Sequence, residues 1–195
     1  SGSLPRDVAL IGAGEKSGGH LVEPIERPRQ CVFLYGAGHV GREVVRVLRG
    51  VEIDLVWVDT SDGRFPPVVP AFAQKVVTDD PESIAEEAPD DAMHLVMTYS
   101  HELDFSICRA VLMGKGFAFL GLIGSKTKRA RFVQRLVRAG VTEARIQLLV
   151  SPIGIGGIAG KSPETSAISV AAQIIMEMER RAAKLPADVS NSRAG

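Results

Sequence analysis

The 195-residue chain is poor in cysteine and in aromatic side chains, and it has no excess of charge of either sign. Its two cysteines, Cys31 and Cys108, lie in separate apolar segments without zinc-ligand spacing, so we expect buried, reduced thiols and no metal site. Because 23 basic residues balance 23 acidic ones, no general attraction to nucleic acid or to an anionic membrane is expected. No apolar run approaches the roughly 20 residues of a membrane-spanning helix and no secretory leader is visible, which favours a cytoplasmic protein.

Short apolar segments alternate with segments of helical periodicity through most of the chain. Segment 31–35 is continuously apolar, as in a parallel strand buried on both faces, and apolar residues then recur at helical spacing up to Leu48. The same alternation predicts strands at 31–35, 53–58, 75–77, 94–97, 117–123 and 147–150, and helices at 40–48, 80–87, 103–113, 125–139 and 163–183. This order predicts an α/β fold of Rossmann-like type, with a doubly wound, mainly parallel sheet and helices on both faces.

The two ends of the chain differ from the central domain of residues 31–183. Residues 1–30 are rich in proline and glycine, and two short apolar pieces at 8–11 and 20–25 predict a small N-terminal β extension, such as a hairpin. Residues 184–195 are polar, and we expect a loose tail there.

The segment GAGHVG, residues 36–41, follows the first predicted strand and opens a helix, which is the setting of a dinucleotide-binding turn. Gly36 permits a tight turn, Gly38 lets a pyrophosphate approach the backbone, and Gly41 allows the helix to pack closely on the strand. Asp59 ends the next strand and can accept hydrogen bonds from ribose hydroxyls, which favours NAD, ADP or AMP over NADP, but the nearby Arg64 leaves this choice open. The alternative is a glycine turn that serves packing alone.

Two further glycine turns follow later strands. GLIGSKTKR, residues 121–129, leads into a helix with Ser125 as its expected N-cap. We expect this helix to bury Phe132, Val133, Leu136 and Val137 and to expose a basic face of Lys128, Arg131, Arg135 and Arg138. SPIGIGGIAGKSPE, residues 151–164, precedes the last helix and could cradle an anion. Three such turns on one edge of a sheet favour a phosphate-bearing ligand; a capped helix with a solvated basic face is the alternative for the second turn.

No catalytic constellation accompanies these turns. Thr98 and His101 follow the fourth predicted strand at the same edge, where His101 could hydrogen-bond a ligand, move a proton, or only cap a helix or face solvent. The sequence has no recognisable Ser-His-Asp set, hydride-transfer pair or metal cluster, so we expect a binding protein rather than an enzyme.

Together these segments resemble the xanthine dehydrogenase accessory family of XdhC/CoxI type. The resemblance is carried by VEPIERPRQCVFLYGAGHVGREV, VWVDTSDGRF, MTYSHELD, FLGLIGSKTKRARF and SPIGIGGIAGKSPE, which span most of residues 22–175. It implies a Rossmann-like domain in a chaperone that binds molybdenum cofactor (molybdopterin), assists its sulfuration and delivers it to a xanthine dehydrogenase-type apoenzyme. It also implies a homodimer, with a cysteine desulfurase as a further partner.

The resemblance implies cofactor-binding roles for the nucleotide fingerprint and for the family's other motifs. These residues are Gly36, Gly38, His39, Gly41, Asp59, Thr98, His101, Gly124, Ser125, Lys126, Lys128, Arg129, Gly160 and Lys161. The family usually has a further N-terminal domain with a cysteine that is a candidate molybdenum ligand, and residues 1–30 are the expected remnant of that domain. Because glycine turns and cations suit NAD(H) as well as molybdopterin, an NAD-dependent oxidoreductase and a nucleotide-sensing regulatory module are the alternatives.

Overall fold

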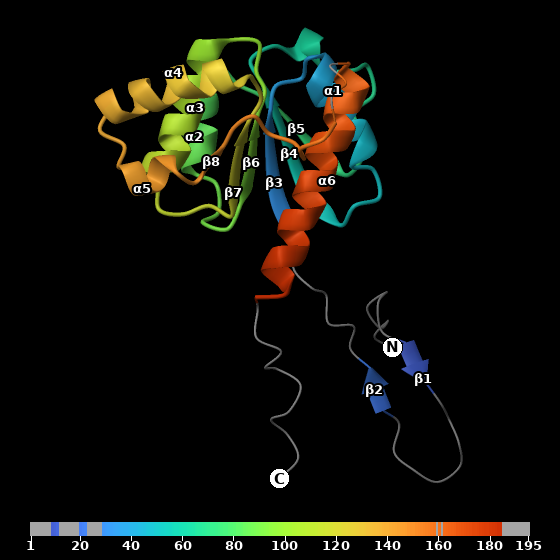
Figure 1. The fold of residues 1–195 in the computed structure, drawn as a ribbon. Coiled ribbons are helices and arrows are strands. Elements are labelled where there is room, and N and C mark those ends of the chain that lie inside the picture. The colour runs from blue at the N-terminus through green and yellow to red at the C-terminus, as the bar shows by residue number, and fades with distance from the viewer. Residues whose placement is uncertain (1–8, 12–19, 23–28, 159, 161, 185–195) are drawn as a thin grey trace, which may run out of the picture.

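Six parallel strands form the sheet that organises this protein (Figure 1). They are β3 (Gln30–Tyr35), β4 (Ile53–Asp59), β5 (Ala73–Val77), β6 (Met93–Val96), β7 (Phe119–Leu122) and β8 (Leu149–Val150). Their order across the sheet is β5-β4-β3-β6-β7-β8, so the direction of growth reverses between β3 and β6. In open α/β sheets such a switch point is where ligands commonly bind. The computed structural model describes residues 9–11, 20–22, 29–158, 160 and 162–184.

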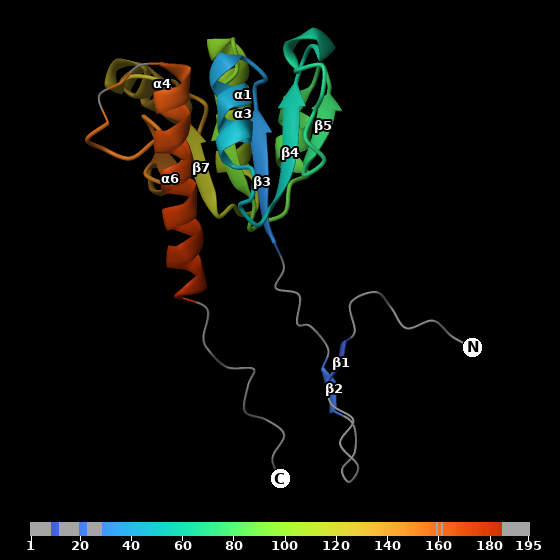
Figure 2. The ribbon, with the colours of Figure 1, turned by 90° about the vertical axis from the view of Figure 1, so that its right-hand side faces the viewer.

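Helices cover both faces of the sheet. They are α1 (His39–Val47), α2 (Pro81–Glu86), α3 (His101–Met113), α4 (Lys126–Arg138), α5 (Glu143–Ile146) and α6 (Pro163–Ala182). Figure 1 shows α1 and α6 on one side of the sheet and the other four on the opposite side, and in Figure 2 α1 and α6 lie in front of the strands. None of the helices that the structure describes is both long and apolar enough to span a membrane.

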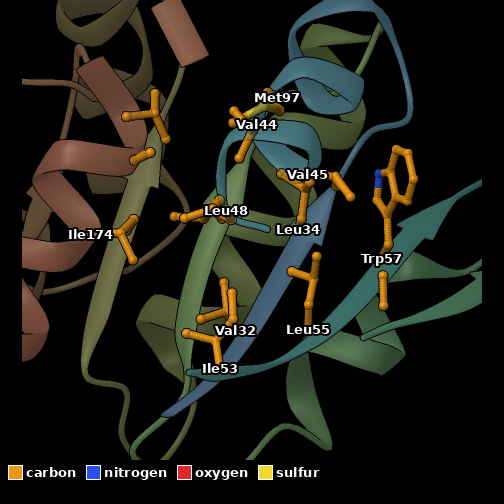
Figure 3. Close-up of a cluster of buried hydrophobic side chains, with 14 of the residues drawn as sticks. Val32, Leu34, Val44, Val45, Leu48, Ile53, Leu55, Trp57, Met97 and Ile174 are labelled. Atoms are coloured by element: carbon orange, nitrogen blue, oxygen red, sulfur yellow. The ribbon is translucent and has the colours of Figure 1, made fainter. Parts of the chain in front are cut away.

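Residues of β3 alternate between the two hydrophobic cores. Val32 and Leu34 pack with α1 and α6, whereas Phe33 and Tyr35 pack with α2 and α3, and all four are at most 7% exposed. Figure 3 shows the first core, where Val44 and Val45 of α1 and the residue that follows the helix, Leu48, contribute side chains. Burial on both faces fixes the strands, and therefore also fixes the loops that follow their carboxyl ends.

The N-terminal segment contains two short strands, β1 (Ala9–Ile11) and β2 (His20–Val22), which pair antiparallel with Ala9 opposite Val22. The β extension expected from the sequence is therefore present. The other residues of segment 1–28, and all of the predicted tail after Lys184, lie outside the described residues.

The predicted Rossmann-like α/β fold is confirmed, but one helix was missed and the predicted faces of another were partly wrong. The four-residue helix α5 was not predicted, because one turn is too short to show a helical period. In α4, Val137 is 57% exposed although we expected it in the core, whereas the side chain of Lys128 is only 13% exposed. The helix contacts the core through Phe132 and Leu136, and Lys128 lies one turn before Phe132 on that same side.

Candidate functional site

The first glycine turn, residues 36–41, packs tightly against its own neighbours. Gly36 has a φ of +116°, and a Cβ there would overlap the carbonyl oxygen of Met97. A Cβ on Gly41 would overlap the Gly36 carbonyl oxygen, which also accepts a hydrogen bond from Trp57 Nε1 (3.0 Å). Two of the three glycines are therefore required by the packing of the chain itself.

Gly38 is the exception in this turn. It is exposed, its φ of −73° suits any residue, and no neighbouring atom lies within 4 Å of the position of a Cβ. His39 follows as the exposed first residue of α1. The structure gives no internal reason for glycine at position 38, and an open backbone is what an approaching phosphate needs. The ligand-binding roles of Gly38 and His39 stay predictions.

Both carboxylate oxygens of Asp59, which is 6% exposed, are already hydrogen-bonded. Oδ2 accepts from the Ala37 amide (2.7 Å), and Oδ1 accepts from the Ser61 amide (3.1 Å) and the Arg64 guanidinium (2.7 Å). The Arg42 guanidinium adds a second clamp by donating to the carbonyls of Ala37 (3.1 Å) and Arg64 (2.8 Å). The role of Asp59 toward a ribose stays a prediction, and ribose hydroxyls would compete with these donors.

A small recess of about 10 Å³ lies beside this clamp, at the switch point of the sheet. Its lining includes Asp59 and, from the loop after β6, Thr98 and Tyr99. The Arg64 guanidinium stacks on the Tyr99 ring, 3.7 Å from its centroid, as a cation–π pair. The recess is far smaller than the roughly 300–1,000 Å³ of typical small-molecule sites.

The loop after β6 is tied to the start of α3. The Thr98 amide donates to Asp104 Oδ1 (2.9 Å), and the Thr98 hydroxyl lies 2.8 Å from the same oxygen. Ser100 caps α3 by accepting from the Leu103 amide (3.4 Å). His101, the first residue of this helix, is exposed. The ligand-binding roles of Thr98 and His101 stay predictions.

The second glycine turn joins β7 to α4. Ser125 Oγ accepts from the Lys128 amide (3.2 Å), so the predicted N-cap is confirmed. The Lys128 ammonium forms an ion pair with the buried carboxylate of Asp104 (2.6 Å). Sequence reasoning had not selected Asp104, because nothing near it in sequence identifies its partner. Lys126 is exposed and Arg129 is partly exposed, so these two cations of the turn can still meet a ligand.

A cleft of about 460 Å³ lies between the second turn, the loop at 152–160 and the first half of α6. Its walls combine glycines, branched aliphatic side chains and the hydroxyls of Thr165, Ser166 and Ser169. Gly124 and Gly160, both predicted as binding residues, line it, whereas Lys161 lies outside the described residues. The cleft thus unites the second and third turns, and no residue of 36–41 belongs to its described lining.

The third glycine loop is fastened to α6. The Gly154 amide donates to Gln173 Oε1 (2.6 Å), and Ser169 Oγ donates to the Ile155 carbonyl (3.2 Å). Gly154 has a φ of +114° that favours glycine, whereas Gly156 lies outside the left-handed region and a Cβ there would meet nothing within 4 Å. Gly156 is therefore open in the same way as Gly38.

Polar groups around the cleft differ in what they offer an anion. Ser162 Oγ accepts from the Thr165 amide (3.2 Å), which makes Ser162 the N-cap of α6 as predicted. A hydrogen bond from its own amide, with a second from Ser162, lowers the pKa of the Glu164 carboxyl, so this helix end already has a negative charge. Ser151 Oγ, by contrast, is buried without a hydrogen-bond partner among the described residues, directly before Pro152 in the cleft wall.

Both thiols are at least partly buried. Cys108 is buried and Cys31 is partly buried, and burial raises the pKa of both thiols. The expectation of two buried thiols holds fully only for Cys108. Within the described ranges, no cluster of three or more His, Cys, Asp and Glu residues could hold a metal ion.

Comparisons with known proteins agree with this architecture. Residues 32–174 match the model of the XdhC Rossmann domain. The uncharacterized protein YqeB of Escherichia coli K12 is 29% identical over 152 residues, which are 76% of this chain and 27% of that protein. The crystal structure of a xanthine dehydrogenase from Bacillus halodurans superposes with a TM-score of 0.65 at 25% identity, covering 79% of this chain and 44% of that one.

This chain spans less than half the length of either relative. The family match, however, covers well over half of this chain, from β3 to the middle of α6, and includes all three glycine turns. The strand order and the strand–turn–helix units around the cleft are those of a Rossmann domain. The chain therefore belongs to the family of XdhC Rossmann domains.

Proposed function

We propose that this domain binds molybdenum cofactor in the cleft between its second and third glycine turns, as part of an accessory protein that delivers the cofactor to a xanthine dehydrogenase-type enzyme. Membership of the XdhC family and the likeness to a xanthine dehydrogenase support the class of client enzyme. The cleft is the observation that carries the binding proposal, because its volume of about 460 Å³ suits a small molecule.

The residues of the cleft fit molybdopterin in their chemistry. Branched side chains such as Ile153 and Ile155 suit a flat pterin ring, and the open backbone at Gly156 suits close approach of a polar group. The exposed Lys126, two residues after Gly124, suits the phosphate. The buried hydroxyl of Ser151, which has no partner in the described structure, adds an unmet hydrogen-bonding group beside the wall.

In this proposal the chain binds, orients and shields its ligand. The phosphate lies toward Lys126 rather than toward α6, since Glu164 places a carboxylate at the start of that helix. The hydroxyls of Thr165 and Ser166 orient polar groups, and the aliphatic walls exclude water. When bound by the client enzyme, the cofactor supplies redox chemistry at molybdenum, and we assign no chemical step to residues of this cleft.

Partners beyond the client apoenzyme, namely a second copy of the chain and a cysteine desulfurase, stay predictions from the family resemblance.

One observation favours the nucleotide-sensing alternative: Gly38 is open, and no internal contact explains why this position is a glycine. The recess of about 10 Å³ beside Asp59, whose lining does not include Gly38, is too small to hold an adenine or nicotinamide ring.

Three matched glycine variants test where the ligand binds. Gly156, Gly38 and Gly63 are all exposed, outside the left-handed region and uncrowded, so leucine at each position should leave the fold intact. Gly156→Leu fills the cleft, Gly38→Leu blocks the first turn, and Gly63→Leu is the control. After expression in a cofactor-replete host, we expect Gly156→Leu alone to reduce pterin released from the denatured protein at least tenfold, measured by fluorescence and mass spectrometry.

The same measurements can refute the proposal. Wild-type protein that releases no pterin, or a Gly156→Leu variant that releases as much as wild type, would contradict cofactor binding in the cleft. A melting temperature that rises with NAD or AMP, and no longer does so in Gly38→Leu, would instead support nucleotide sensing.

A further inference from the structure

An ion pair between Asp104 of α3 and Lys128 of α4 lies beside the second glycine turn. The Lys128 ammonium is 2.6 Å from Asp104 Oδ2, and the two side chains are 13% and 1% exposed. Every other ion pair in the described part of the chain has a partner that is at least 32% exposed. Removing one member of a buried pair leaves an uncompensated charge, so this pair is far more consequential than a surface pair.

Hydrogen bonds extend the pair to two strand ends. Asp104 Oδ1 accepts from the Thr98 amide (2.9 Å), and Lys128 Nζ donates to the Ile123 carbonyl (2.9 Å) as well as to Asp104. Thr98 follows β6 and Ile123 follows β7, which are neighbours in the sheet. The pair therefore joins the loop after β6 to the turn after β7, with the charged groups of both members engaged.

Gly124 leaves room for the Lys128 side chain to reach Asp104. A Cβ at position 124 would lie 2.5 Å from Lys128 Cδ, so the absence of a side chain lets the lysine stem pass over the turn. Gly124 and Ile123 both line the 460 Å³ cleft. The path of the Lys128 side chain and the position of this cleft wall are therefore coupled.

We infer that Asp104 and Lys128 are positioning residues for the cleft: they hold the wall at Ile123 and Gly124, and Lys128 does not bind the ligand's phosphate. The identity of the occupant rests on the proposed function, whereas the position of the wall does not. Lys128, which the sequence grouped with the ligand-binding cations, thus has a structural role, and the exposed Lys126 is the cation that meets the phosphate.

Hydrogen–deuterium exchange on two methionine variants of α4 tests this inference. Lys128→Met removes the ion pair with Asp104, whereas Lys126→Met, two residues earlier on the same helix, removes an exposed cation. We expect the amides of Ile123 and Arg129, which donate to the carbonyls of Val96 and Ser125, to exchange at least tenfold faster in Lys128→Met and at the wild-type rate in Lys126→Met. Lys128→Arg, which keeps the charge and a similar stem, should restore most of the protection. A purely global loss of stability would accelerate exchange in β3 as well.

A double variant keeps the test informative if Lys128→Met does not fold. Asp104→Asn combined with Lys128→Met leaves no unpaired buried charge, so it should fold while the amides of Ile123 and Arg129 lose protection. Unchanged protection in either variant would overturn the inference. Pterin content separates this result from the proposed function: Lys128→Met should lose pterin together with amide protection, and Lys126→Met should lose pterin alone. If wild-type protein releases no pterin, the proposed function fails while the exchange pattern still decides the positioning role.

Discussion

All three glycine turns share the same strand–glycine–helix pattern, but their surroundings differ. The first turn is filled by the protein itself, whereas the second and third border an open cleft. The first is closed by its own chain, since Asp59, Arg42 and Trp57 all bond to its backbone, and the recess beside Asp59 measures about 10 Å³. The later turns border a cleft of about 460 Å³. A glycine motif therefore marks a place where other atoms come close to the backbone. It does not show whether those atoms belong to a ligand or to the protein itself.

The largest effect expected from testing this contrast comes from Gly36→Ala in the closed turn. The positive φ and the overlap with the Met97 carbonyl should together cost about 4 kcal/mol of unfolding free energy, measured in urea. Gly38→Ala, two residues on, is the control and should change stability by less than about 0.5 kcal/mol, because its surroundings are open. A loss below about 1 kcal/mol in Gly36→Ala would mean that the turn opens easily, and the contrast would disappear.

A pH titration tests the sheet below the first turn, because His94 lies on β6, beside the strand β3 that leads into this turn. It is 1% exposed, its Nδ1 is 3.2 Å from the Tyr35 hydroxyl, and burial lowers its pKa from 6.5 to about 4. Below pH 6.5 the His94 imidazole is protonated in the unfolded chain, whereas in the folded protein it stays neutral down to about pH 4. The free energy of unfolding should therefore fall by about 3 kcal/mol between pH 6.5 and pH 4.

His94→Gln isolates this contribution. Glutamine can still bond to the Tyr35 hydroxyl but does not titrate, so the unfolding free energy of this variant should fall by about 3 kcal/mol less than that of wild type between pH 6.5 and 4. Chemical denaturation at a series of pH values gives both curves. Parallel curves would show that other groups cause the acid sensitivity.

A smaller effect is expected from Asp59→Asn, which weakens the clamp on the first turn. An amide cannot satisfy all three donors that the carboxylate now accepts, so the unfolding free energy should fall by about 2 kcal/mol. Asp62→Asn is the matched control, since that carboxylate is 77% exposed, and it should change stability by less than about 0.5 kcal/mol. Equal effects in the two variants would remove Asp59 as a clamp.

The fold was predictable from the sequence because local pattern and tertiary context agree in its strands and caps. The run 31–35 is apolar throughout and forms a strand packed on both faces, and Ser125 and Ser162 cap the helices that they precede. Prediction failed at Val137, where the helical pattern allows several rotations of α4 about its axis. Which rotation occurs depends on contacts with α3 that no local segment specifies.

The candidate site was less predictable, because side-chain partners come from distant segments. From the sequence, Asp59 is predicted to accept hydrogen bonds from a ribose, but in the structure it accepts them from Ala37, Ser61 and Arg64. Lys128 is likewise predicted to be a surface cation, but it is paired with Asp104, 24 positions away in the chain. Asp104 itself had no sequence signal beyond being one of two acids in the first turn of a helix, the other being Glu102. Composition and motif spacing therefore did not reveal which charged residues pair with one another in the folded protein.

Trp57 gives the first turn its own optical reporter. It is the sole tryptophan of the chain, it is 1% exposed, and its indole N–H is bonded to the Gly36 carbonyl. Emission excited selectively at tryptophan should therefore shift toward the red whenever water reaches this turn, without any introduced label. A ligand in the cleft contacts none of residues 36–41, so it should change this signal less than opening of the first turn does.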